Sequence, residues 1–201
     1  LNRREVVESM IRARLGFFDA VYDARKCTVI ELDHEQAQRF MDVNHLDCAS
    51  KCSTRLGLIT HSGELVAVMT FGVPRNGTKW LHHVEVKRYA SLLNTCVRGG
   101  IGKLTKYFLR TQQLNMQRHH LMTYVHLRHG EGHSYEHAGF TRIGEVPLGF
   151  HWTTGGGRRL HRSRIVADRS RGMSEREVAA ERGYHRIYDC GVAQFEMLFD
   201  R

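Results

Sequence analysis

The feature that most constrains the fold is a run of glycines that joins a segment of strand character to one of helix character. Residues 80–89 are rich in aromatic and β-branched side chains, and residues 101–113 carry apolar side chains three or four positions apart. Gly99, Gly100 and Gly102 allow the intervening backbone N–H groups to approach an anion, which the helix dipole also attracts. We therefore predict either an anion-binding turn or a tight turn without a ligand.

The order of the remaining elements predicts an α/β fold of the α+β kind, with a mixed, mostly antiparallel central sheet flanked by helices. Ser174 and Glu177 have the spacing of a capping box, which predicts a helix that ends near Arg182. Strands are expected over 27–32, 55–61, 64–72, 80–89, 120–125, 140–146 and 149–153, helices over 4–15, 35–44, 99–113 and 134–138, and a final hairpin over 184–190 and 193–199.

These elements suggest three parts of the chain. We expect an N-terminal helix and linker over residues 1–26, a core over 27–166 and a small helix-hairpin appendage over 167–201. The chain opens with Leu1 instead of Met, so we also expect it to be a piece of a longer protein.

The charge of the chain is its most informative bulk property. Lys and Arg number 30 against 21 Asp and Glu, which gives a net charge of +9 and an isoelectric point near 9.6. Such an excess favours a polyanionic partner, above all nucleic acid. The sequence has no apolar run of ~20 residues and no basic helix with a large apolar face, so we expect no membrane partner. The best candidates for phosphate contacts are Arg158, Arg159, Arg162 and Arg164.

Cysteines and histidines are numerous, but their spacing predicts no metal site. The five scattered cysteines favour a reducing compartment over a disulfide framework. His45, Cys48 and Cys52 have ligand-like spacing without a matching second pair of ligands, and the histidines at 82–83 and 119–120 form no known motif. A rival hypothesis is that His126, His129 and His133 converge around a turn to bind a metal.

A second motif gives the glycine run a more specific meaning. About 33 residues beyond Gly102 comes Tyr-Glu-His-Ala-Gly-Phe (135–140), which a strand-like segment follows. A glycine-rich loop followed by this motif resembles the GNAT acyltransferases. The resemblance implies that the loop grips the pyrophosphate of acetyl-CoA or a related acyl-CoA and that Tyr135 is the general acid toward the leaving thiolate. The loop residues would be Arg98, Gly99, Gly100, Gly102 and Lys103.

Longer segments resemble a phage-borne group of GNAT-like proteins. RLGLITHSGELVAVMTFG (55–72), EVKRYASLLNTCVRGGIGKL (85–104) and YEHAGF (135–140) are similar to the Mom DNA-adenine modification enzymes and to domains attached to very-short-patch-repair-like phage homing endonucleases. Residues 3–27 resemble the last helix of such a nuclease. The resemblance implies a DNA partner and the cytoplasm of a phage-infected bacterium.

Two departures from the family pattern leave the function open. Val97 stands where the family usually has Gln or Arg, and His126 stands where the phage group usually has an aspartate. Glu85 and His126 are the candidate general bases for an attacking amine. The glycine loop and Tyr135 favour an acyltransferase, whereas Val97 and His126 favour a non-catalytic DNA-binding module. A basic module that binds another protein is the third alternative.

Overall fold

A computed structural model describes residues 3–74, 83–112 and 120–198, and its contacts divide the chain into two compact units. Unit 1 comprises residues 1–124, 132–143 and 195–201, and unit 2 comprises residues 125–131 and 144–194. This division differs from the expected boundaries at 26/27 and 166/167, because segments distant in the sequence contribute to the same unit. Among the described residues, no helix has both the length and the apolar character that a membrane span requires.

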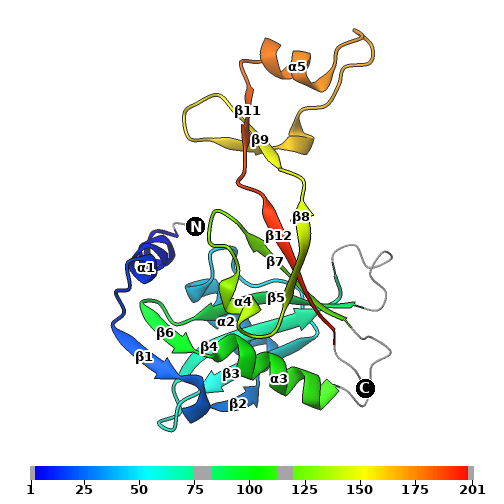
Figure 1. The fold of residues 1–201 in the computed structure, drawn as a ribbon. Coiled ribbons are helices and arrows are strands. Elements are labelled where there is room, and N and C mark those ends of the chain that lie inside the picture. The colour runs from blue at the N-terminus through cyan, green and yellow to red at the C-terminus, as the bar shows by residue number, and fades with distance from the viewer. Residues whose placement is uncertain (1–2, 75–82, 113–119, 199–201) are drawn as a thin grey trace. The chain divides into compact units, whose positions relative to one another are not determined.

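A seven-stranded sheet organises unit 1 (Figure 1). Pairing is antiparallel from β2 to β5 and parallel between β5 and β7. The mixed, mostly antiparallel α/β architecture expected from the sequence is thereby confirmed. In spatial order the strands are β2 (Thr28–Glu31), β3 (Thr54–Ile59), β4 (Leu65–Gly72), β5 (His83–Ser91), β7 (His120–His126), β12 (Val192–Leu198) and β8 (Thr141–Val146).

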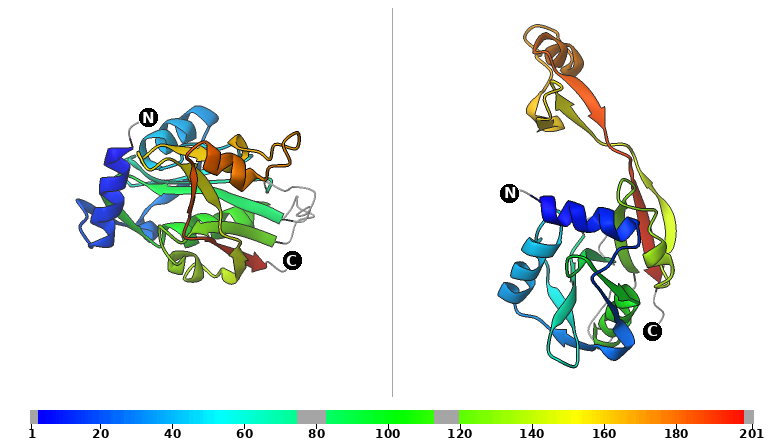
Figure 2. Two further views of the ribbon diagram at one scale, coloured as in Figure 1. Left: turned by 90° about the horizontal axis from the view of Figure 1, so that it is seen from above. Right: turned by 90° about the vertical axis from the view of Figure 1, so that its left-hand side faces the viewer.

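Helices α2 (His34–Asn44) and α3 (Gly100–Gln112) cover opposite faces of this sheet (Figure 2). Val68 of β4 packs in a buried cluster with residues of α2, while the next residue, Met69, contacts Thr105 of α3 at 3.9 Å. Because successive side chains of a strand point to opposite faces, these two contacts place the helices on the two sides. A capping box formed by Asp33 and Gln36 fixes the start of α2.

The other elements of unit 1 are short. Helix α1 (Arg4–Arg14) precedes β1 (Ala20–Asp23), which pairs in parallel with β6 (Thr95–Arg98), and a 3₁₀ turn, η1 (Ala24–Lys26), follows β1. Helix α4 (His133–Glu136) overlaps the start of the second family-like motif, which covers residues 135–140. Strands β1 and β6 were not predicted, because they pair with each other across about 75 residues of sequence and no local pattern encodes such a pairing.

Unit 2 has a separate core on a three-stranded antiparallel sheet. The sheet comprises β10 (Arg159–His161), β9 (Phe150–Thr153) and β11 (His185–Tyr188). Helix α5 (Glu175–Glu181) begins with the predicted capping box of Ser174 and Glu177, and a 3₁₀ turn, η2 (Arg162–Arg164), follows β10. The buried side chains are Trp152, Ile165, Val178 and Ala179.

The expected final hairpin is wrong. Strands β11 and β12 correspond to its two arms, but β11 pairs with β9 while β12 belongs to the seven-stranded sheet. The intervening residues include Asp189, whose carboxylate accepts hydrogen bonds from the backbone N–H groups of Gly149 and Gly191. This local network fixes a path that leads away from hairpin pairing. The strand expected over 80–89 begins outside the described residues and is seen from His83 onward.

Candidate active site

The candidate site of unit 1 lies where two parallel strands cease to pair. Strands β5 and β7 share three residue pairs, from His83 opposite His120 to Glu85 opposite Met122. Both strands continue beyond these pairs, to Ser91 and to His126, and within the described residues they form no further ladder with each other. Beyond these three pairs the described parts of the facing edges are not bonded to each other, which makes their backbone N–H and C=O groups candidates for hydrogen bonds to a ligand.

The glycine run forms the turn into α3, as predicted. Gly99 has φ of +72°, a conformation that strains other residues, and Gly100 is buried with no room for a side chain. A Cβ at Gly100 would lie 2.5 Å from the hydroxyl of Tyr89. The backbone conformation therefore explains Gly99 and the packing explains Gly100, whether or not a ligand binds.

Gly102 differs from its two neighbours. A Cβ there would lie 3.8 Å from the Cα and Cβ of Ala138, which is an ordinary contact, and its φ is not positive. The residue belongs to the first turn of α3, whose backbone N–H groups have no partner within the helix. Arg98 precedes this turn with an exposed side chain. The start of α3 thus combines N–H donors, a favourable dipole and one nearby cation.

Tyrosine hydroxyls gather beside this turn. Tyr89 of β5 lies against Gly100, and Tyr135 of α4 forms a hydrogen bond with Thr123 of β7. Burial raises the pKa of Tyr135, although the bond with Thr123 opposes the rise. Burial also raises the pKa of Tyr89, with a further contribution from the nearby Tyr135. The glycine turn and the predicted acid are therefore brought together, through a tyrosine that the sequence analysis did not assign to the site.

Lys103 has a structural use in unit 1. Its ammonium group donates hydrogen bonds to the backbone carbonyls of Ala24, at 2.8 Å, and of Cys27. These bonds connect α3 to the 3₁₀ turn η1. Lys103 was predicted to place a positive charge near a coenzyme, but its ammonium group already donates to these two carbonyls.

Glu85 is almost buried on β5 and forms an ion pair. Its Oε2 lies 2.9 Å from Nζ of Lys87, and the two side chains are 11% and 13% exposed. Lys87 also donates to the carbonyl of Val73. The Glu85 carboxylate contributes to a raised pKa of Tyr124, whose main cause is burial. The carboxylate of Glu85 therefore already has a cationic partner, and a role as a base would require this ion pair to rearrange.

The remaining predicted site residues lie in unit 2. His126 is exposed, and its ring meets that of His129 edge to face, with centroids 6.2 Å apart. Arg158, Arg159, Arg162 and Arg164 lie on or beside β10 and η2, all are exposed, and within the described residues none of them forms an ion pair.

The sequence-spaced metal candidates do not gather into a common site. His45 accepts a hydrogen bond from the backbone N–H of Asp47, and Cys48 accepts one from Arg3. His133 pairs with Glu136 at 2.9 Å. Over the described residues, one group of three potential ligands is close enough to hold an ion, and it consists of His83, His120 and Glu196. Sequence spacing could not reveal this group, because its members come from three strands.

Comparison with solved structures identifies the fold. A spermidine/spermine N-acetyltransferase from Vibrio cholerae matches with a TM-score of 0.50 and 10% identity, over 87% of this chain and 94% of that one. A structure of the spermidine N-acetyltransferase from Vibrio cholerae, in complex with CoA and spermine, gives a TM-score of 0.50, 11% identity and coverage of 87% and 96%. A protein of Acinetobacter baylyi proposed to be an acetyltransferase gives 0.51, 11%, 87% and 92%.

The chain has a GNAT-type acetyltransferase fold. At such low identity the likeness concerns the architecture and transfers no residue roles, because one fold hosts many functions. No family model and no curated protein matches the sequence. The resemblance to Mom enzymes and to homing-endonuclease domains therefore stays a prediction.

Proposed function

We propose that the protein is an acyltransferase that uses acetyl-CoA or a related acyl-CoA. The observation that carries this proposal is the gap in pairing between β5 and β7, beside which the glycine turn and Tyr135 lie. This arrangement offers N–H donors for an anion, strand edges for an extended chain and a protonated hydroxyl for a leaving group.

The coenzyme would bind in two parts. Its pyrophosphate would lie at the start of α3, where Gly102 leaves the N–H groups accessible and Arg98 adds positive charge. Its pantetheine arm carries amide groups that can pair with the free edges of β5 and β7, as an added strand does. Lys103 would act indirectly, because its bonds to the carbonyls of Ala24 and Cys27 hold α3 in position.

Acid and base roles follow from the environments of the side chains. Tyr135 carries its proton at neutral pH as tyrosines ordinarily do, and burial raises its pKa further. Its hydroxyl would supply this proton to the departing thiolate. Glu85 would accept the proton of an attacking amine, and its ion pair with Lys87 would have to rearrange as it does so. His126, in unit 2, is the alternative base. The resemblance to Mom enzymes suggests an amino group of a DNA base as the acceptor.

Calorimetric titration with acetyl-CoA tests the coenzyme site, with Gly102→Glu as the diagnostic variant. The third helical position of α3 tolerates a glutamate, since Gly102 has room for a Cβ and an acidic group there favours the helix dipole. The same carboxylate would repel the pyrophosphate. We expect at least an approximately tenfold loss of affinity, which corresponds to ~1.4 kcal/mol.

Gly144→Glu is the matched control, because it adds the same charge at an exposed glycine of β8 with nothing within 4 Å. This variant should bind acetyl-CoA as the unaltered protein does. Equal affinity of the unaltered protein and Gly102→Glu, or no binding by the unaltered protein at millimolar coenzyme, would contradict the proposed site.

A second candidate function is supported by unit 2. Its four exposed arginines at 158, 159, 162 and 164 form no ion pair among the described residues, in a chain with a net charge of +9. Unpaired guanidinium groups at a surface are well suited to phosphate contacts. We propose that this surface binds DNA, which would be the protein's main role if catalysis is absent.

A further inference from the structure

A three-residue cluster in unit 1 has no part in the proposed acyl transfer. His83 opens β5 and His120 opens β7, and the two residues are opposite each other in the parallel ladder. Their side chains therefore lie on the same face of the sheet. The imidazole rings are stacked, with centroids 4.5 Å apart and an angle of 19° between their planes.

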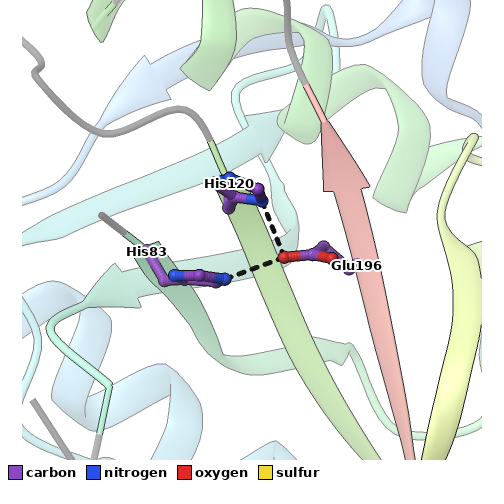
Figure 3. Close-up of side chains that lie close together, drawn as sticks. All are labelled: His83, His120 and Glu196. Atoms are coloured by element: carbon purple, nitrogen blue, oxygen red, sulfur yellow. Dashed lines mark hydrogen bonds and ion pairs between the residues drawn. The ribbon is translucent and has the colours of Figure 1, made fainter. Parts of the chain in front are cut away.

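Glu196 completes the cluster from β12, the strand next to β7 (Figure 3). Its Oε1 lies 2.8 Å from Nε2 of His83 and 2.8 Å from Nδ1 of His120. The three potential ligand atoms are within 4.8 Å of one another. Three elements that are distant in the sequence thus direct two nitrogens and one oxygen toward one point.

We propose that His83, His120 and Glu196 bind one divalent ion of a first-row transition metal, such as Zn²⁺. Two imidazoles and one carboxylate are a ligand set that such ions favour, with bonds of about 2.0–2.2 Å. An ion enters if the carboxylate draws back and the two rings turn from their stacked arrangement toward a common centre. Three protein ligands leave a further coordination position for water or substrate.

Burial and neighbourhood support a built site. The side chains of His83, Glu196 and His120 are 12%, 18% and 32% exposed, so they have given up much of their hydration. A metal ion replaces the lost hydration of the carboxylate more fully than hydrogen bonds to two imidazoles do. Glu85 lies two residues beyond His83 on the same strand and hence on the same face. An ion held here would therefore lie near the proposed base.

The test is calorimetric titration of the 201-residue chain with Zn²⁺ after EDTA treatment and dialysis. We expect one tight site in the unaltered protein and affinity at least about tenfold weaker in Glu196→Gln. Glutamine keeps the size of the side chain and can accept the same hydrogen bonds, but it is a poor metal ligand. His34→Gln removes an exposed histidine at the start of α2 and should leave the tight site intact.

His120→Gln provides a second variant in case Glu196→Gln fails to fold, since its side chain is the most exposed of the three. Co²⁺ titration of the unaltered protein adds a readout that does not depend on any variant, because visible d–d absorption reports the coordination number. The proposal is overturned if the unaltered protein binds no Zn²⁺, if Co²⁺ stays six-coordinate, or if folded ligand variants bind as tightly as His34→Gln. The cluster is then a hydrogen-bonded triad alone.

Discussion

Tyr89 links the glycine turn to Tyr135, the predicted acid, by contacts that no sequence pattern indicates. Its hydroxyl occupies the space that a side chain at residue 100 would need, and its electrostatic coupling to Tyr135 places the two phenols close together. Gly100 is therefore required by packing whether or not a coenzyme binds. Of the three glycines, Gly102 is the one whose lack of a side chain is best explained by the approach of a ligand.

The buried phenols predict a loss of stability at alkaline pH. Burial raises the pKa of both Tyr89 and Tyr135, so above about pH 10 the unfolded chain loses these protons while the folded chain keeps them. The free energy of unfolding should then fall as pH rises, by up to ~1.4 kcal/mol per pH unit for each tyrosine. The double variant Tyr89→Phe, Tyr135→Phe should show a shallower fall in urea unfolding between about pH 9 and about pH 11.

Tyr188→Phe is the control for this series, because Tyr188 is 56% exposed. It should follow the unaltered protein throughout. Identical pH dependence in the double variant and the unaltered protein would mean that both phenols ionise as readily in the folded chain as in the unfolded one.

Residue patterns indicate some members of the candidate sites and cannot indicate others, for a physical reason. The turn at residues 99–102 and Tyr135 were predictable because each belongs to a local motif. Lys103 was expected to face a coenzyme, but its bonds to the carbonyls of η1 depend on the tertiary position of that turn. Glu196 meets His83 and His120 through strand order, and no spacing rule encodes contacts across three strands.

At the scale of elements, α3 determines where the glycine turn lies. Phe108 of α3 stacks on Phe71 of β4, with ring centroids 3.9 Å apart and an angle of 6° between the rings. Both side chains are almost completely buried. The N-terminal turn of α3 is therefore held against the sheet by a contact two turns further along the helix.

Phe108→Ala should lower the free energy of unfolding by about 3–5 kcal/mol, because it removes a large buried ring and leaves a cavity against Phe71. Urea denaturation followed by circular dichroism measures this change. Lys106→Ala, at an exposed position of the same helix, should change stability by less than about 0.5 kcal/mol. If the two variants were equally stable, the aromatic pair would not be what holds α3 to the sheet.

Sequence periodicity indicates which segments form helices and strands, but it does not indicate which strands pair. Helices α2, α3 and α5 were predictable from apolar spacing, the glycine turn or a capping box, and each is present near its expected bounds. The hairpin expected over 184–199 was wrong because strand character does not specify a partner. Strand β11 pairs with β9, about 35 residues earlier, and β12 joins the central sheet.

At the scale of the whole molecule, the positive charge is unevenly compensated. Several arginines of unit 1, such as Arg4 and Arg39, pair with carboxylates one helical turn away. In unit 2, Arg171 pairs with Asp168 and Glu181. The four arginines at 158, 159, 162 and 164 have no such pairing among the described residues. If DNA binds through specific phosphate contacts, these four should dominate its salt dependence.

A comparison of two variants with equal charge tests this proposal. One replaces Arg158, Arg159, Arg162 and Arg164 by alanine, and the other replaces four exposed arginines of unit 1, namely Arg4, Arg25, Arg39 and Arg110. Each variant has a net charge of +5, which is the native +9 less four. Fluorescence anisotropy of a labelled duplex, measured over a range of salt concentrations, gives the slope of log affinity against log salt.

The unit 2 variant should lose up to about 0.9 from the magnitude of this slope for each phosphate contact removed, and the unit 1 variant should keep nearly the native slope. The reason is that counterions are released only where guanidinium groups contact phosphates, whereas a change in net charge alone acts through a screened, long-range potential. Equal slopes for the two variants would assign any DNA affinity to overall charge. The proposal that unit 2 has a DNA-binding surface would then be withdrawn. The proposed coenzyme site would be unaffected, because the titration of Gly102→Glu tests it separately.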